Sequence, residues 1–256
     1  FDGLTRMNKQ TGKCQDATSL LQGNLSTGKP KVSCITEDKE KNLWVGTYGS
    51  GLYKINLPTQ HVTYYESTRN ENDDWSINRL PNDWISCLLE DKEGKLWIGT
   101  YKGLAVLNPQ TNNFIEYKKQ NNLLPGYVVY SLLESTKGEI WAGTSEGLVC
   151  MNKKDLIPVH FTTADGLPSD IICGLAEDEK GNIWISTHQG ISKLNPQEKK
   201  FINYYAGDGL QGNEFTRTAV FKDKRGKIFF GGTNGVTAFY PQDITEIKKE
   251  LNVLIT

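Results

Sequence analysis

The stretch NLWVGTYGSGLYKIN (42–56) decides the fold, because close variants of it return along the chain. These variants are KLWIGTYKGLAVLN (95–108), EIWAGTSEGLVCMN (139–152), NIWISTHQGISKLN (182–195) and KIFFGGTNGVTAFY (227–240). The five segments share an aromatic anchor at intervals of 53, 44, 43 and 45 residues, namely Trp44, Trp97, Trp141, Trp184 and Phe229. A nearly fixed period in this range is typical of a repeat architecture.

Composition narrows the possible functions. The chain has 256 residues and a formal net charge of −1, which gives no electrostatic footprint for nucleic acid. No apolar run approaches the roughly 20 residues of a membrane helix, and the opening FDGLTRMN is not a secretory signal. Five cysteines without a CxxC pair indicate neither a disulfide framework nor a zinc site. Because residues 3–8 already resemble the end of a repeat, we expect the chain to be part of a longer array.

Four short strands are predicted in each repeat. The first is an apolar run, as in strands buried on both faces: VSCITED (32–38), ISCLLED (85–91), VYSLLES (129–135), ICGLAED (172–178) and AVFKD (219–223). The second contains the anchor, and the third follows a tight loop that ends in glycine. The fourth is more polar and aromatic: HVTYYE (61–66), FIEYK (114–118), VHFT (159–162) and FINYY (201–205).

The turn between the first two strands has its own pattern. One register holds a glycine that suits a hairpin with positive φ, at Gly94, Gly138, Gly181 and Gly226. The first repeat has Lys41 there, and we expect the neighbouring Asn42 to adopt the left-handed conformation instead. Glu-Asp pairs recur at this turn (37–38, 90–91 and 177–178), so we interpret them as turn-capping residues and not as a catalytic acid and base.

Three further registers describe packing. Ten residues before each anchor stands a small residue, which indicates a need for low volume rather than sulfur chemistry: Cys34, Cys87, Ser131, Gly174 and Ala219. Two residues after it, close approach by a neighbouring backbone is predicted from Gly46, Gly99, Gly143 and Gly231, with Ser186 as the exception. Twelve residues before it, Arg217 replaces the apolar Val32, Ile85, Val129 and Ile172.

Together these elements predict an all-β protein, a β-propeller of four-stranded antiparallel blades stacked around an axis. We expect a partial leading blade (1–25), four blades (26–70, 71–118, 119–162 and 163–205) and a last blade (206–245). The tail (246–256) is either a closing strand or the start of a following β-sandwich. About five to six blades would then belong to a larger propeller. No segment has the sustained 3.6-residue periodicity of an α-solenoid.

The repeat unit, EDxxGxLWIGTxxGLxxxN with the lead-in DGLPSD (165–170), resembles the two-component regulator propeller repeat. The segment GLQGNEFTRTAVFKDKRGKIFFGGTNGVTAFYPQDI (209–244) is similar to the terminal repeat of such sensors, which precedes a small β-sandwich. The resemblance implies the C-terminal part of a larger, seven-bladed propeller in the periplasmic sensor region of a Bacteroidetes hybrid two-component system. It also implies an oligosaccharide ligand, no cofactor, a homodimer in the full receptor, and signalling to a cytoplasmic histidine kinase through membrane segments absent here.

No sequence pattern indicates catalysis or metal binding. GxSxG, HExxH and P-loop motifs are missing, and the three histidines fall in different registers. We expect His61 and His160 to be solvated or edge-packed, whereas His188, in a loop beside an anchor, is a candidate ligand contact. The acidic cluster of Glu71, Asp73 and Asp74 lacks an EF-hand pattern and is interpreted as solvated.

Candidate ligand contacts gather in two kinds of loop that share one face of a propeller. The longest insertion (66–84) carries Trp75 and Trp84, which could stack on sugar rings or instead cap the blade edge and plug the first strand. The loops between strands two and three offer Tyr48, Tyr101, Glu146, His188 and Asn234. The last lead-in offers Asn213, Glu214 and Arg217, where Arg217 either contacts the ligand or forms a structural ion pair with Glu214 or a neighbouring blade.

Three functions remain open at this point. The first is a glycan-sensing module of a receptor, and the second is a protein-interaction or dimerisation scaffold whose ligand site lies elsewhere. A propeller lyase or hydrolase is the third, since fold alone does not exclude catalysis.

Overall fold

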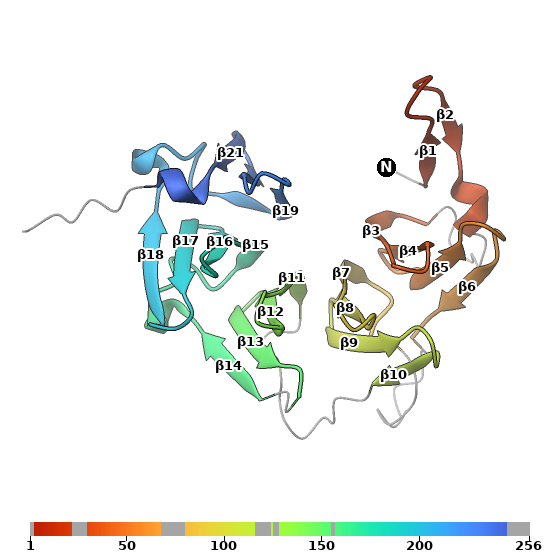
Figure 1. The fold of residues 1–256 in the computed structure, drawn as a ribbon, viewed down its shortest axis with the longest axis horizontal. Helices are drawn as coiled ribbons and strands as arrows, with labels where there is room; N and C mark the ends of the chain where they lie inside the picture. Colours follow the sequence, from red (N-terminus) through yellow and green to blue (C-terminus); the bar gives the residue numbers. More distant parts are fainter. Residues whose placement is uncertain are drawn as a thin grey trace, which may run out of the picture.

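The computed structural model describes residues 3–21, 30–67, 80–115, 124, 128–154 and 157–244, which form a fan of small antiparallel sheets (Figure 1). The first blade contains β3 (Val32–Glu37), β4 (Asn42–Thr47), β5 (Leu52–Asn56) and β6 (Val62–Tyr65). The second contains β7 (Ile85–Glu90), β8 (Leu96–Thr100), β9 (Gly103–Asn108) and β10 (Asn113–Ile115). The third contains β11 (Val129–Glu134), β12 (Glu139–Thr144), β13 (Gly147–Asn152) and β14 (Pro158–Phe161).

The fourth blade contains β15 (Ile172–Glu177), β16 (Ile183–Thr187), β17 (Gly190–Asn195) and β18 (Lys200–Tyr204). The fifth contains β19 (Phe215–Lys222), β20 (Ile228–Gly232) and β21 (Gly235–Phe239). A leading hairpin, β1 (Thr5–Met7) and β2 (Cys14–Asp16), precedes them. The described helices are short 3-10 turns at Thr18–Leu21, Thr163–Asp165, Ala206–Asp208 and Pro241–Asp243. None of these described helices is long and apolar enough to cross a membrane.

The five blades are arranged around a common centre, as predicted for a β-propeller. The inner strands contact one another in chain order, β3 with β7, β7 with β11, β11 with β15 and β15 with β19. Within each blade the strands pair from the inside outwards in sequence order. The resulting arc is open between β19 and β3 (Figure 1). The all-β architecture with four-stranded antiparallel blades is therefore confirmed.

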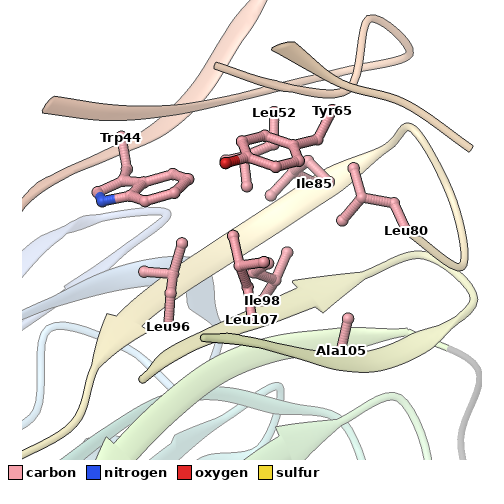
Figure 2. Packing of buried hydrophobic residues seen from close by; sticks show 9 residues of the cluster. All are labelled: Trp44, Leu52, Tyr65, Leu80, Ile85, Leu96, Ile98, Ala105 and Leu107. Carbon is pink, nitrogen blue, oxygen red and sulfur yellow. The ribbon is translucent and has the colours of Figure 1, made fainter. Parts of the chain in front are cut away.

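The hydrophobic core lies between blades, because each tryptophan anchor packs onto the blade that follows it. Trp44 of the first blade lies with Leu52 and Tyr65 against Ile85 and Leu96 of the second blade (Figure 2). The four tryptophan anchors are at most 2% exposed. The fifth blade differs, since its anchor Phe229 is half-buried and the neighbouring Phe230 is buried. No sixth blade is described that could cover Phe229.

The turns between the first two strands confirm one prediction and correct another. The four glycines of the turn register have φ between 79° and 83°. Lys41 itself adopts the left-handed conformation with φ of 66°, so the assignment of this conformation to Asn42 is wrong. The reason is that Asn42 must be extended to begin β4, and its side chain binds Asp38, with Nδ2 donating to Oδ2 over 2.8 Å.

The glycines two residues after the anchors accommodate side chains, not the neighbouring backbone that the sequence suggested. A Cβ atom on Gly46 would lie 2.6 Å from Cys34 Sγ across the strand pair and 2.7 Å from Ile85 Cγ2 of the next blade. Gly143 meets Ile172 in the same way. The fourth blade reverses the pair, since Ser186 stands at this position opposite Gly174. The prediction of a low-volume residue ten positions before each anchor is therefore confirmed. This residue pairs across the strands with the residue two positions after the anchor, and both must be small.

The recurrent aspartates cap their turns, as expected, and also bind the anchors. Asp38 accepts the backbone N–H groups of Glu40 and Asn42, and its Oδ2 accepts Trp44 Nε1 over 2.8 Å. Asp91 and Asp178 bind Trp97 and Trp184 at 2.9 and 3.0 Å. The third blade has Ser135 instead, and Trp141 Nε1 has no partner among the described residues. The sequence pattern alone did not reveal this indole contact.

The glutamates in the register just before this turn link neighbouring blades, including Glu134, which is followed by a serine. Glu90 Oε2 accepts the backbone N–H of Lys39 from the first blade over 3.2 Å, and Glu134 Oε2 accepts that of Lys92 over 2.8 Å. The fifth blade has Lys222 in this register, and its Nζ donates to the carbonyl of Glu177 over 2.6 Å. These bonds hold the blades together at the turn edge, away from the loops considered next.

Candidate functional site

Two loop types meet at one end of the inner strands in every blade. The first residue after the second strand donates its backbone N–H to the carbonyl of the residue that precedes the inner strand. The pairs are Tyr48 with Lys31, Tyr101 with Trp84, Ser145 with Val128, His188 with Ile171 and Thr233 with Glu214, at 2.9 to 3.3 Å. This repeated bond places both sets of predicted contact residues on the same edge of the blades, at the end of the inner strands that we call the channel mouth.

Three aromatic residues form a cluster at this mouth. Ring centroids are 6.0 Å apart for Tyr48 and Trp84, 5.5 Å for Trp84 and Tyr101, and 6.2 Å for Tyr48 and Tyr101. Trp84 is 49% exposed and Tyr48 is 40% exposed. The alternative of Trp84 as a plug against the first strand is therefore wrong, because about half of its surface is exposed and its ring lies against these two tyrosines. Trp75 and the acidic cluster of Glu71, Asp73 and Asp74 lie outside the described residues.

The backbone around this aromatic cluster is fixed from two sides. Asp83 accepts the backbone N–H groups of Gly49 and Gly51 through its carbonyl, each over 3.1 Å. Its carboxylate accepts the backbone N–H and the hydroxyl of Ser67 over 2.5 and 2.7 Å. Gly49 has φ of 87°, and a Cβ atom there would lie 3.2 Å from Trp84 Nε1. The three rings are thus held by short-range backbone contacts before any ligand arrives.

Arg217 does not occupy the register that its distance from the anchor suggested. In the first four blades the residue paired with the end of the second strand is apolar, as with Ile172 opposite Thr187. In the fifth blade Phe215 takes this place opposite Gly232, and it is 1% exposed. The inner strand then bulges before pairing resumes at Val220. The predicted substitution of arginine for an apolar core residue is therefore wrong, since two extra residues shift the count.

Arg217 lies in this bulge and reaches across to the third blade. Its guanidinium carbon is 4.4 Å from the centre of the Tyr130 ring. The side chain is exposed, and among the described residues it forms no ion pair, so the expected structural pair with Glu214 is not observed. Tyr130, which the sequence reasoning missed, stands at the bulge of β11. The signal that could have identified it is its position, eleven residues before the anchor and one residue beyond the apolar register.

The electrostatics connect Arg217 with the aromatic cluster. Burial is the largest cause that raises the pKa of Tyr48, and the nearby Arg217 lowers it in part. The pKa of Tyr130 is likewise raised by burial and lowered in part by Arg217. Burial raises the pKa of the Cys173 thiol to about 12, with Arg217 opposing this shift and Glu214 adding to it. The guanidinium is therefore within electrostatic range of three different blades.

Comparison with known proteins identifies the repeats. The model of the two component regulator propeller matches residues 28–49, 79–102 and 166–189. Three of the five repeats, the first, second and fourth, therefore match the model of the two component regulator propeller. No match is found among curated proteins. The extracellular domain of the putative hybrid two component system BT3049 from B. thetaiotaomicron is similar at 28% identity and a TM-score of 0.79, over 93% of this chain and 31% of that one.

Two further solved structures share the fold. The extracellular domain of the putative hybrid two component system BT4673 from B. thetaiotaomicron has 20% identity and a TM-score of 0.70, over 93% of this chain and 30% of that one. Virginiamycin B lyase from Staphylococcus aureus has 16% identity and a TM-score of 0.60, over 82% of this chain and 70% of the enzyme. The present chain thus spans about a third of the two sensor domains and is homologous to part of an extracellular sensor domain.

The remaining candidates occupy repeat positions with identifiable structural roles. Asn213 Oδ1 accepts the backbone N–H of Ala206 over 2.7 Å, as Asp170 accepts that of Thr163. Asn213 therefore caps the linker between the fourth and fifth blades. Glu214 is exposed, and its carbonyl is held by Thr233 and Gln211. His188 is half-buried in the loop register of Tyr48 and Tyr101. Among the described residues no group of three acidic, cysteine or histidine side chains could hold a metal ion.

Proposed function

We propose that this chain is a ligand-sensing part of the extracytoplasmic, periplasmic region of a hybrid two-component receptor. It binds an oligosaccharide at the mouth of the propeller channel, and the receptor passes the signal to a cytoplasmic histidine kinase. The homology to an extracellular domain of such a system supports the receptor class. The observation that carries the ligand class is the cluster of Tyr48, Trp84 and Tyr101, whose rings lie together and half exposed at the channel mouth.

The chemistry of this aromatic cluster suits a sugar. Aromatic rings offer a large rigid contact area, and the hydroxyl and indole N–H groups at their edges can bond to polar ligand groups. A pyranose presents the same combination, with C–H bonds on its faces and hydroxyls around its rim. Exposed apolar groups that gather at one site mark an interaction surface, whereas scattered ones need no explanation. The rigid backbone around Gly49 and Asp83 lowers the ordering cost of binding.

A titration with matched variants tests this proposal. Isothermal calorimetry with a panel of neutral and acidic oligosaccharides should detect binding by the protein, and Trp84→Ala should weaken it at least about tenfold, within the usual cost of losing an aromatic anchor. Phe221→Ala is the control, because Phe221 is 62% exposed but lies at the opposite end of its inner strand. Equal loss in both variants would contradict the assignment of the site.

The alternative functions give different results in the same experiment. Binding of no oligosaccharide, together with a stable dimer in light scattering, would favour a protein-interaction scaffold. Conversion of an oligosaccharide during the titration would favour a lyase or hydrolase. The homodimer expected for the full receptor remains compatible with the sensing proposal, provided that ligand binding is observed.

A further inference from the structure

The inner-strand bulge of the fifth blade differs from those of the other four. In each of the first four blades one residue separates the apolar register from the resumed pairing: Ser33, Ser86, Tyr130 and Cys173. Two of these donate a bond to the next inner strand, Ser86 to the carbonyl of Val129 and Cys173 to that of Phe215 at 3.2 Å. These bulges therefore help to join neighbouring blades.

The fifth bulge is longer and holds a charge instead. Residues 216–219 lie between the paired Phe215 and Val220, and Thr218 in this segment has φ of 61°. A β-branched residue is uncommon in the left-handed region, where it is held only by the surrounding structure. The extended bulge turns Arg217 out of the strand and towards Tyr130 on the third blade. Strain of this kind in the wall of a channel is typical of a functional position.

The charge of Arg217 is positioned but not neutralised. Its guanidinium lies on the Tyr130 ring, which restrains the side chain without consuming its N–H donors. The charged or titratable groups that face it include Glu214 on its own lead-in, Cys173 on β15 and Tyr48 on the first blade. Glu214 is exposed and forms no ion pair with it among the described residues. The forked guanidinium is therefore free to bind an anion.

We propose that the oligosaccharide bound at this mouth is acidic, and that Arg217 selects it by pairing with a carboxylate or sulfate group while the aromatic cluster holds the adjoining sugar ring. This inference rests on the proposed function and adds the charge of the ligand to it. A neutral sugar would accept single hydrogen bonds from the guanidinium, whereas a carboxylate or sulfate group accepts two parallel bonds and adds the attraction between opposite charges. Tyr130 acts as a positioning residue, since it holds the guanidinium and reaches the ligand only through it.

The test compares ligands that differ only in charge. Calorimetry would use tri-galacturonate, the neutral galactose trisaccharide of the same linkage, and a sulfated form of that trisaccharide. The unsubstituted protein should bind at least one acidic form at least about tenfold more tightly than the neutral form, in line with hydrogen bonds to charged groups. Preference for the uronate or for the sulfated sugar then distinguishes the two sources of negative charge.

Variants separate charge from packing. Arg217→Gln should lower the affinity for the acidic sugar about 10- to 100-fold and leave the neutral sugar within about twofold. Arg217→Lys, which keeps the charge without the fork, should be intermediate. Arg225→Gln is the control, because Arg225 is 76% exposed in a turn at the other end of β19. Tyr130→Leu should lower the affinity for the acidic sugar more than the affinity for the neutral sugar. It should also make binding of the acidic sugar more dependent on salt concentration.

The outcomes distinguish this inference from the function beneath it. Equal affinity for acidic and neutral sugars, unchanged in Arg217→Gln, would overturn the acidic-ligand inference and leave oligosaccharide sensing intact. An Arg217→Gln variant that loses both ligands equally would also overturn it, because the arginine would then serve the site as a whole. Binding of no sugar by the unsubstituted protein would overturn both.

Discussion

The fourth and fifth blades follow one sequence template and use it differently. The fourth places Ile172 in the apolar register, Cys173 in a one-residue bulge and a buried Trp184 at the anchor. The fifth places Phe215 in that register, Arg217 in a longer bulge and a half-buried Phe229 at the anchor. The inner strand of the fourth blade contacts the inner strands of the third and fifth blades. The inner strand of the fifth blade contacts that of the fourth and also presents the exposed, charged Arg217.

This difference shows how a repeat protein can acquire a site without rebuilding its core. Each blade contributes half of two interfaces, so stability depends on nearest neighbours. Residues 216–218 of the fifth bulge are exposed, so this segment can change in length and charge without loss of buried contacts between blades. The apolar register cannot change as freely, and in the fifth blade a phenylalanine at a shifted position preserves it.

The largest expected effect concerns the two anchors. Trp184→Ala should destabilise the protein by about 3–5 kcal/mol, because it removes a fully buried aromatic from the interface between the fourth and fifth blades. Phe229→Ala should cost about 1 kcal/mol or less, since that ring is only half-buried and lies against the exposed Phe221 and the side chain of Lys227. Urea denaturation followed by circular dichroism measures both. Similar losses for the two variants would show that burial against the following blade does not determine the role of an anchor.

A second comparison tests the register of the fifth inner strand. Phe215→Ala should cost about 3–4 kcal/mol, comparable with Ile172→Ala in the fourth blade, because both side chains fill the same interface position. Arg217→Ala should change the free energy of unfolding by less than about 0.5 kcal/mol, as for other exposed residues. If Arg217→Ala is as destabilising as Phe215→Ala, the simple residue count from the anchor was correct and the observed register is not the one populated in solution.

The Phe215 and Arg217 assignment shows where sequence reasoning reached its limit. Counting from the anchor located the strands, the turns and the small register, because these depend on hydrophobic period and on φ requirements that leave a sequence signature. The same count failed across the fifth bulge, since the length of a bulge is decided by which residues finally pair and not by local preference. An arginine next to a threonine gives no indication that the strand will make a detour there.

The candidate site was predictable in part for the same reason. Tyr48, Tyr101 and Trp84 were placed on one edge by topology alone, because loops of one kind in a propeller share a face. Their mutual contact was not predictable, since it depends on the backbone bonds that Asp83 makes with Gly49 and Gly51. Tyr130 was missed because it lies within the apolar inner strand β11, where an aromatic residue is expected in the core, and it is indeed buried. Its position at the bulge of β11 becomes informative only when the structure shows that Arg217 of the fifth blade lies against its ring.

A third, smaller effect concerns the aspartates of the two turns. Asp178 accepts Trp184 Nε1 and the backbone N–H groups of Lys180 and Asn182. Asp178→Ala should therefore cost about 1–3 kcal/mol, because it leaves a buried indole donor unsatisfied. Asp223→Ala should cost less, since the fifth anchor has no indole and Asp223 pairs with the exposed Arg225. Thermal unfolding of both variants gives the comparison. An equal loss of stability in the two variants would mean that the aspartates stabilise both blades through turn capping and not through the indole bond.

The smallest expected effect is at Thr218, where the fifth bulge departs furthest from the fourth. Thr218→Gly should stabilise the protein by about 0.5–1 kcal/mol. Glycine removes the penalty of about 1–2 kcal/mol for the left-handed conformation, but it also increases the entropy of the unfolded chain, which offsets part of this gain. The same change should weaken ligand binding slightly, since the bulge that presents Arg217 becomes less ordered.

Cys173→Gly is not a suitable control, because Cys173 bonds to Phe215. Gly207→Ala is better, since a Cβ atom there meets nothing within 4 Å. The idea that the strained bulge holds Arg217 in place predicts that Thr218→Gly raises the free energy of unfolding and lowers the ligand affinity. A variant that is more stable and also binds the ligand more tightly would contradict this idea.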